Sequence, residues 1–155
     1  MKQRLYLDTS VFGGCFDAEF EDFSKQIIQR IQDGEFILLF SSVTQDEIQN
    51  APTAVKELIV HIRKKDTEFL EVTDDTVELA NKYIEAGVVG PTSYADCLHI
   101  AAATISKADY LVSWNFKHIV NVFRIRGYNS INLAVGLKEL EIRSPRDLMK
   151  YEDQN

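Results

Sequence analysis

Four polar residues lie where chemistry is expected in a protein of alternating strands and helices. Asp8 directly follows an apolar run, and Asn115 comes two residues after another. Glu47 and Asp96 each fall in the expected first turn of a helix. Because ligands of parallel sheets bind outside the carboxyl ends of the strands, these side chains are expected to approach one cleft.

The three acids of this set predict a metal centre. Carboxylates that share a cleft raise one another's pKa unless a cation holds them. Ligation by oxygen alone suits Mg²⁺ or Mn²⁺ better than zinc. Such an ion activates water and clamps a phosphodiester oxygen. Asp8, Glu47 and Asp96 therefore indicate metal-dependent phosphodiester hydrolysis.

A structural interpretation of the same acids stays open. Thr44 precedes Glu47, and Ser93 precedes Asp96, by the three residues of a capping box, so each acid could bond to its own helix. Asp8 could likewise form an Asx turn with its own loop. Spacing alone favours neither cap nor metal ligand for Glu47 and Asp96.

Hydropathy patterns predict the elements that must position these residues. Apolar runs predict strands over residues 4–8, 35–41, 69–72, 110–113 and 140–143. Helical spacing and end signals predict helices over about 18–32, 44–51, 53–65 and 74–86, and others opening at 93, near 116 and at 144. The glycines at 13 and 14 are expected to break the chain. This alternation predicts an α/β fold with a mainly parallel sheet.

Length, charge and cysteine content narrow the class of protein. The 155 residues predict a single domain over 1–155. The net charge of −7 argues against general coating of nucleic acid, although residues 117–150 hold seven basic and three acidic residues. With no apolar run of about 20 residues and no export signal, we expect a cytoplasmic protein that does not enter the membrane. Cys15 and Cys97 are then expected to be free thiols.

Four segments carry the candidate residues in a fixed order along the chain. They read Leu5-Tyr-Leu-Asp-Thr-Ser-Val-Phe12, Ser42-Val-Thr-Gln-Asp-Glu-Ile48, Tyr94-Ala-Asp-Cys-Leu-His-Ile-Ala-Ala102 and Ala108-Asp-Tyr-Leu-Val-Ser-Trp-Asn-Phe-Lys-His118. Their order and spacing resemble the motifs of PIN domains over residues 5–120. Within that family the chain is similar to the VapC-like branch, the toxin ribonucleases of bacterial toxin–antitoxin pairs.

The resemblance implies a three-layer α/β/α sandwich and an endoribonuclease that depends on Mg²⁺ or Mn²⁺. It also implies an RNA substrate, an antitoxin protein as partner and a homodimer. Carried over to this chain, it assigns the metal site to Asp8, Glu47 and Asp96. Hydroxyls that position water or phosphate would come from Thr9, Ser10 and Ser113.

Asn115 departs from the pattern, since many relatives have a fourth acid at this position. A neutral amide oxygen binds a hard cation less strongly, which weakens a second metal position. This residue therefore supports an alternative function, a catalytically weak or inactive RNA-binding or scaffold module. A phosphotransfer protein with Asp8 as nucleophile is a third option, but Ser10 stands where a phosphatase of that type would have a second acid.

Two neighbours of these residues have both a packing and a functional interpretation. His99 shares a helix face with Asp96 and is expected to be a packed or surface histidine more often than a residue that supports the acids. Trp114 could stack on a base, although packing is at least equally expected.

Overall fold

The computed structural model describes residues 1–63 and 66–153 and contains one parallel sheet of five strands. The strands are β1 (Gln3–Leu7), β2 (Phe36–Ser41), β3 (Thr67–Leu70), β4 (Tyr110–Val112) and β5 (Ile142–Arg143). Their order across the sheet is β3-β2-β1-β4-β5. All five lie close to the apolar runs that predicted them.

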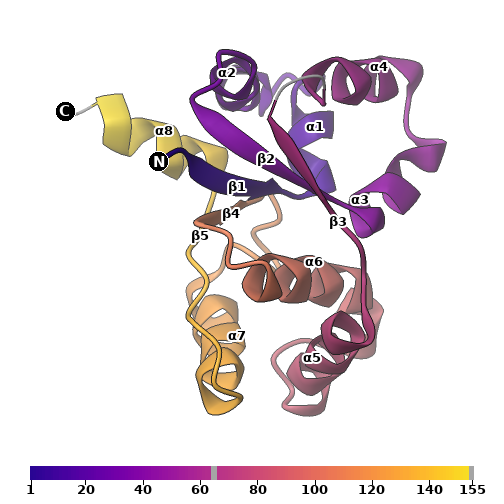
Figure 1. Ribbon diagram of the computed structural model, residues 1–155, viewed down its shortest axis with the longest axis vertical. Helices are drawn as coiled ribbons and strands as arrows, with labels where there is room; N and C mark the ends of the chain where they lie inside the picture. The colour runs from indigo at the N-terminus through magenta and orange to yellow at the C-terminus, as the bar shows by residue number, and fades with distance from the viewer. Residues whose placement is uncertain (64–65, 154–155) are drawn as a thin grey trace.

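Helices cover both faces of the sheet, which confirms the predicted three-layer α/β/α fold (Figure 1). One face is covered by α1 (Thr9–Gly14), α2 (Glu21–Gln32), α4 (Thr53–Ile62) and α8 (Pro145–Asp153). The other face is covered by α5 (Asp74–Glu85), α6 (Tyr94–Ile105) and α7 (Val122–Ala134). The short α3 (Ser42–Glu47) follows β2 directly.

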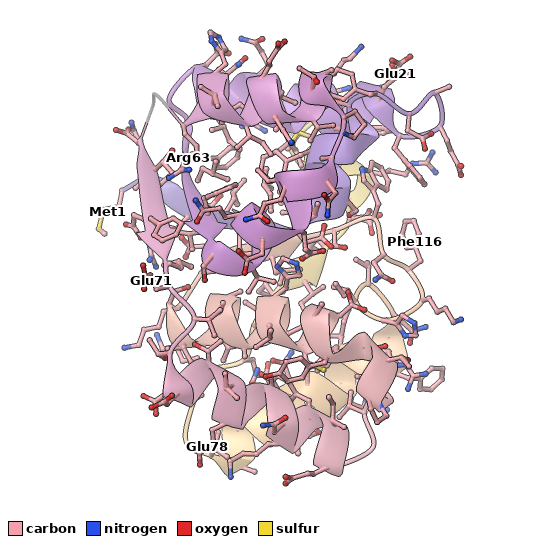
Figure 2. All side chains as sticks on the ribbon, turned by 90° about the vertical axis from the view of Figure 1, so that its right-hand side faces the viewer. Met1, Glu21, Arg63, Glu71, Glu78 and Phe116 are labelled. Atoms are coloured by element: carbon pink, nitrogen blue, oxygen red, sulfur yellow. The ribbon has the colours of Figure 1, made fainter. Side chains whose placement is uncertain are left out.

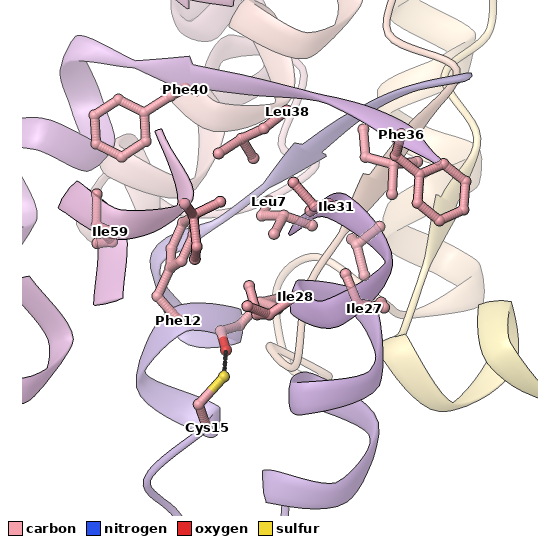
Figure 3. Close-up of a cluster of buried hydrophobic side chains, with 14 of the residues drawn as sticks. Leu7, Phe12, Cys15, Ile27, Ile28, Ile31, Phe36, Leu38, Phe40 and Ile59 are labelled. Atoms are coloured by element: carbon pink, nitrogen blue, oxygen red, sulfur yellow. Dashed lines mark hydrogen bonds between the residues drawn. The ribbon is translucent and has the colours of Figure 1, made fainter. Parts of the chain in front are cut away.

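Side chains of the central strands alternate between two cores. Leu5 and Leu7 of β1 pack with the first helical layer, and Tyr6 between them packs with the second. Figure 3 shows the first of these cores, with Leu7 and Leu38 against Ile28 and Ile31 of α2. This alternation follows from the period of two along a strand, and it directs Tyr6 toward α6.

Several element boundaries differ from those that the sequence predicts. Gly13 and Gly14 do not break the chain but form the end of α1. The helix expected to open near residue 116 is α7, which begins at Val122 because the Asn121 side chain accepts hydrogen bonds from the backbone N–H groups of Phe123 and Arg124. The helix expected over 53–65 ends at Ile62, and its last two predicted residues lie outside the described part of the chain.

In the described part of the chain, no helix is both long and apolar enough to cross a lipid bilayer.

Candidate functional site

The candidate residues gather at the carboxyl edge of the sheet, beside the boundary between β1 and β4. From β1 the chain proceeds to β2 and β3 on one side of the sheet, and β4 and β5 then fill the other side. Such a reversal of strand order opens a crevice at the strand ends, where α/β proteins bind ligands. Figure 2 looks from the side of the molecule where β1 ends, and Phe116, which is 50% exposed, lies at its margin.

Asp8 is held at this edge of the sheet by two hydroxyl groups. Ser10 donates to its Oδ1 at 2.5 Å, and Ser113 donates to its Oδ2 at 2.8 Å. Both hydroxyls accept hydrogen bonds from the backbone after β4, Ser10 from the Trp114 N–H and Ser113 from the Asn115 N–H, each at 2.9 Å. The carboxylate is therefore fixed by donors from both neighbouring strand ends.

Burial makes the negative charge of Asp8 costly. Asp8 is only 5% exposed, and desolvation raises the pKa of its carboxyl above the ordinary value. The hydroxyls of Ser10 and Ser113, and the charge of His99 when its ring is protonated, lower the pKa of Asp8, whereas the charge of Glu47 raises it. A buried carboxylate with a raised pKa in a crevice is a candidate functional group.

Asp96 lies in the first turn of α6 and faces Asn115. The Asn115 amide donates to Asp96 Oδ1 at 3.4 Å, while its Oδ1 accepts from the backbone N–H of His118 at 2.9 Å. Desolvation raises the pKa of Asp96 most strongly, the charges of His99 and His118 lower it, and Glu47 raises it. Asn115 thus presents a donor to Asp96, and its oxygen is used by the local turn.

Glu47 is the last residue of α3 and not, as the sequence suggested, part of a first turn. The helix begins at Ser42 because the Ser41 hydroxyl accepts the Thr44 N–H at 3.2 Å and acts as N-cap. The Glu47 carboxylate instead crosses to α6, where its Oε1 is hydrogen-bonded to Nε2 of His99.

None of the three carboxylates caps its own helix within the part of the chain that the structure describes. Glu47 bonds to His99, Asp96 to Asn115, and Asp8 to two hydroxyls. The capping boxes and the Asx turn that the sequence left open are therefore absent from the described residues. The acids belong to one polar neighbourhood, since the charge of Glu47 acts on both aspartates.

The arrangement is not a ready-made metal cage. Within residues 1–63 and 66–153, no group of three or more His, Cys, Asp or Glu side chains is arranged so that it could hold a metal ion. The donor set nevertheless fits a hard cation. In the described contacts Asp96 Oδ2 and Glu47 Oε2 accept no hydrogen bond, and each Asp8 oxygen accepts only one. These are acceptor positions that a divalent ion could use.

Three other residues that the sequence analysis or the motifs singled out differ in burial and in their distance from Asp8. Thr9 Oγ1 is buried and has no hydrogen-bond partner in the described residues. Trp114 is packed rather than free to stack on a base, since it is 8% exposed, lies 4.5 Å from the Phe20 ring by centroids and donates to Ser24 at 2.8 Å. Asp109 accepts from the Arg4 backbone N–H at 2.7 Å, at the edge of the sheet opposite Asp8.

The two cysteines are unsuited to chemistry at this site. Both are buried and form no disulfide. Desolvation raises the pKa of the Cys97 thiol, next to Asp96, to about 12, and that of the Cys15 thiol to about 11. At neutral pH both therefore remain thiols, which are poor nucleophiles and poor metal ligands.

Tyr6 is a site residue that the sequence analysis missed, and His99 has a larger role than expected. Tyr6 Oη lies 2.5 Å from Nδ1 of His99, and both residues are fully or almost fully buried. A tyrosine among aliphatic residues in a central strand was an available signal, because a buried phenol needs a hydrogen-bond partner.

The fold and this site define a three-layer α/β protein with three acidic residues at the carboxyl edge of its sheet. The sequence profile of the PIN domain matches residues 5–115, and the chain belongs to the PIN-domain family. This confirms the resemblance carried by the four sequence motifs.

A solved structure described as VapBC2 from Rickettsia felis, bound to a DNA fragment from its promoter, has the same fold. The likeness has a TM-score of 0.54 at 12% sequence identity and covers 92% of this chain and 98% of that chain. None of the curated protein sequences with which the chain was compared matches it.

Proposed function

We propose that the protein is a metal-dependent endoribonuclease that forms one PIN domain over residues 1–155. The observation that carries this proposal is that, in the part of the chain that the structure describes, three carboxylates form hydrogen bonds with other side chains and none of them caps its own helix. Asp8, Asp96 and Glu47 lie in one polar neighbourhood at the carboxyl edge of the sheet, and each bonds to another element or to a hydroxyl instead of capping its own helix. Asp8 is almost completely buried, and burying its charge destabilises the fold, so a bound cation gives the arrangement a physical reason.

The chain's own residues would share the work at this site. Asp8 and Asp96 would hold the ion, Mg²⁺ or Mn²⁺, and Glu47 would bind it through water or orient the attacking water. When bound, such an ion lowers the pKa of water and stabilises charge on a phosphodiester. Ser10 and Ser113 keep the Asp8 carboxylate in place, and Thr9, with its buried hydroxyl, is proposed to position water or phosphate.

We further propose that the protein acts in the cytoplasm as the toxin of a toxin–antitoxin pair. The fold likeness to the VapBC2 structure supports an antitoxin partner, and the free thiols of Cys15 and Cys97 agree with a reducing compartment. A homodimer is proposed on the family resemblance alone.

RNA cleavage tests the proposed activity. Purified wild type, Asp8→Asn and Asp109→Asn are incubated with structured RNAs in Mg²⁺, Mn²⁺ or chelator. Wild type and Asp109→Asn should cleave with metal only, because Asp109 lies at the opposite edge of the sheet. Asp8→Asn should be folded and inactive. Undiminished cleavage by Asp8→Asn would reject the assignment of the site.

A non-catalytic RNA-binding or scaffold module is the second candidate, and Asn115 favours it. The family resemblance implies a fourth acid at the position of Asn115. Asn115 instead donates an amide hydrogen to Asp96. RNA binding by wild type without cleavage in any of the metals would support this alternative.

A further inference from the structure

A chain of hydrogen bonds runs from the end of β2 through the core to the carboxylate of Glu47. Ser41 Oγ lies 2.6 Å from Tyr6 Oη, and Tyr6 Oη lies 2.5 Å from Nδ1 of His99. Nε2 of the same ring bonds to Glu47 Oε1. Ser41 and Tyr6 are fully buried and His99 is 2% exposed, whereas the Glu47 side chain is 38% exposed.

The partners along this chain define its direction. An ionised carboxylate only accepts, so Nε2 of His99 must donate to Glu47. When the ring is neutral, Nδ1 is then an acceptor, and Tyr6 donates to it. Tyr6 can do so, because burial raises the pKa of its phenol above the ordinary value. Ser41 donates to Tyr6 in turn, while its oxygen accepts the Thr44 N–H.

We propose that Tyr6 and His99 are positioning residues, which hold the Glu47 carboxylate at the candidate metal site by fixing the His99 ring in the tautomer with hydrogen on Nε2. A glutamate side chain that is 38% exposed would otherwise sample several rotamers. With Oε1 held by the ring, Oε2 remains available for an ion or its water. The metal role of Glu47 rests on the proposed function, whereas the ring tautomer does not.

The first test separates the tautomer from metal binding. In the metal-free protein, ¹⁵N NMR of the histidine side chains should show the Nε2–H form of His99. Tyr6→Phe removes the donor to Nδ1, so Glu47 alone then favours hydrogen on Nε2, and the share of the Nε2–H form should fall below that of wild type. Tyr83→Phe is the matched control, because Tyr83 is also fully buried and its hydroxyl donates to Asn132 at 2.5 Å, outside the candidate site. The control should leave the His99 signals unchanged.

The second test measures Mn²⁺ affinity by calorimetry. His99→Leu, which cannot donate, should weaken binding about 10- to 100-fold, the usual cost of losing a partner of a metal ligand. His99→Gln can both donate to Glu47 and accept from Tyr6, so it should bind Mn²⁺ much more tightly than His99→Leu. Tyr6→Phe should weaken binding in the same direction as His99→Leu, and Tyr83→Phe should not.

Three other outcomes would contradict the positioning role or the proposed function. A wild-type tautomer and wild-type Mn²⁺ affinity in Tyr6→Phe would overturn the positioning role, as would equal weakening by Tyr83→Phe. If wild type binds no Mn²⁺ at all, the proposed function fails and the metal role of Glu47 with it. The NMR comparison would then still decide whether Tyr6 fixes the ring.

Discussion

The Ser113 hydroxyl donates to Oδ2 of Asp8 at 2.8 Å and so joins the carboxyl ends of β4 and β1. Together with Ser10 on the other oxygen, it holds a carboxylate that is almost completely buried. The two bonds lower the pKa of Asp8, but desolvation is the larger effect and the net shift is upward. The fold therefore disfavours a negative charge on Asp8.

The raised pKa of Asp8 predicts how its charge affects stability. An acid whose pKa is higher in the folded than in the unfolded state binds more protons when folded, so stability falls as pH rises through that interval. The interval begins near the ordinary aspartate value of about 3.9. Wild type should therefore lose stability relative to Asp8→Asn as pH rises from about 4 toward neutrality.

Chemical denaturation of both proteins across this pH range, without divalent metal, measures the difference. Asp109→Asn serves as the control, because its carboxylate accepts a backbone hydrogen bond at the opposite edge of the sheet. A difference between wild type and Asp8→Asn that is constant with pH would contradict the raised pKa.

Asn115→Asp should convert the amide position into a fourth acid. The new carboxylate can still accept the His118 N–H, but it replaces the donor to Asp96 with a like charge. Without metal, the variant should be about 1 kcal/mol less stable than wild type. With Mn²⁺ it should bind more tightly and cleave RNA faster. Calorimetry and cleavage assays check this, and weaker Mn²⁺ binding by the variant would count against a site beside Asp96.

The glycine pair at the end of α1 gives a stability test with an internal control. A Cβ at Gly14 would lie 2.5 Å from Ser24 Oγ and 2.9 Å from Trp114 Nε1, and so would disrupt the bond between them. Gly14→Ala should cost about 1–3 kcal/mol in the free energy of unfolding.

Gly13→Ala should have the opposite sign. A Cβ at Gly13 has no heavy atom within 4 Å, and alanine favours a helix over glycine by about 0.5–1 kcal/mol. Urea denaturation of the two variants compares them directly. Equal destabilisation by both substitutions would show that crowding at Trp114 is not the cause.

Much of the fold could be predicted from sequence because apolar runs and helix-end residues are local signals. Residues 35–41 are apolar on both faces, and Phe36–Ser41 of this run form β2, which lies beside the central strand β1. The prediction for Gly14 was wrong, because the crowding that requires a glycine there comes from Ser24 and from Trp114, which lies one hundred positions away in the sequence.

The candidate site was predictable only in part. Asp8, Glu47 and Asp96 could be named from their places after strands and in motifs. Their partners could not, since the Glu47–His99 bond joins α3 to α6 and the Tyr6–His99 bond joins β1 to α6. Such contacts depend on how the layers pack. Local spacing also suggested helix caps for Glu47 and Asp96. In α3, which contains Glu47, the N-cap is Ser41 instead.

The central claim is that Asp8, Asp96 and Glu47 bind one divalent ion together. A Mn²⁺ titration monitored by electron paramagnetic resonance tests this claim most directly. Wild type and Asp109→Asn should bind Mn²⁺ with the same affinity. Asp8→Asn, Asp96→Asn and Glu47→Gln should each bind far more weakly, and the two aspartate variants should lose most. Wild-type affinity in all three variants, or no binding by wild type, would contradict the account.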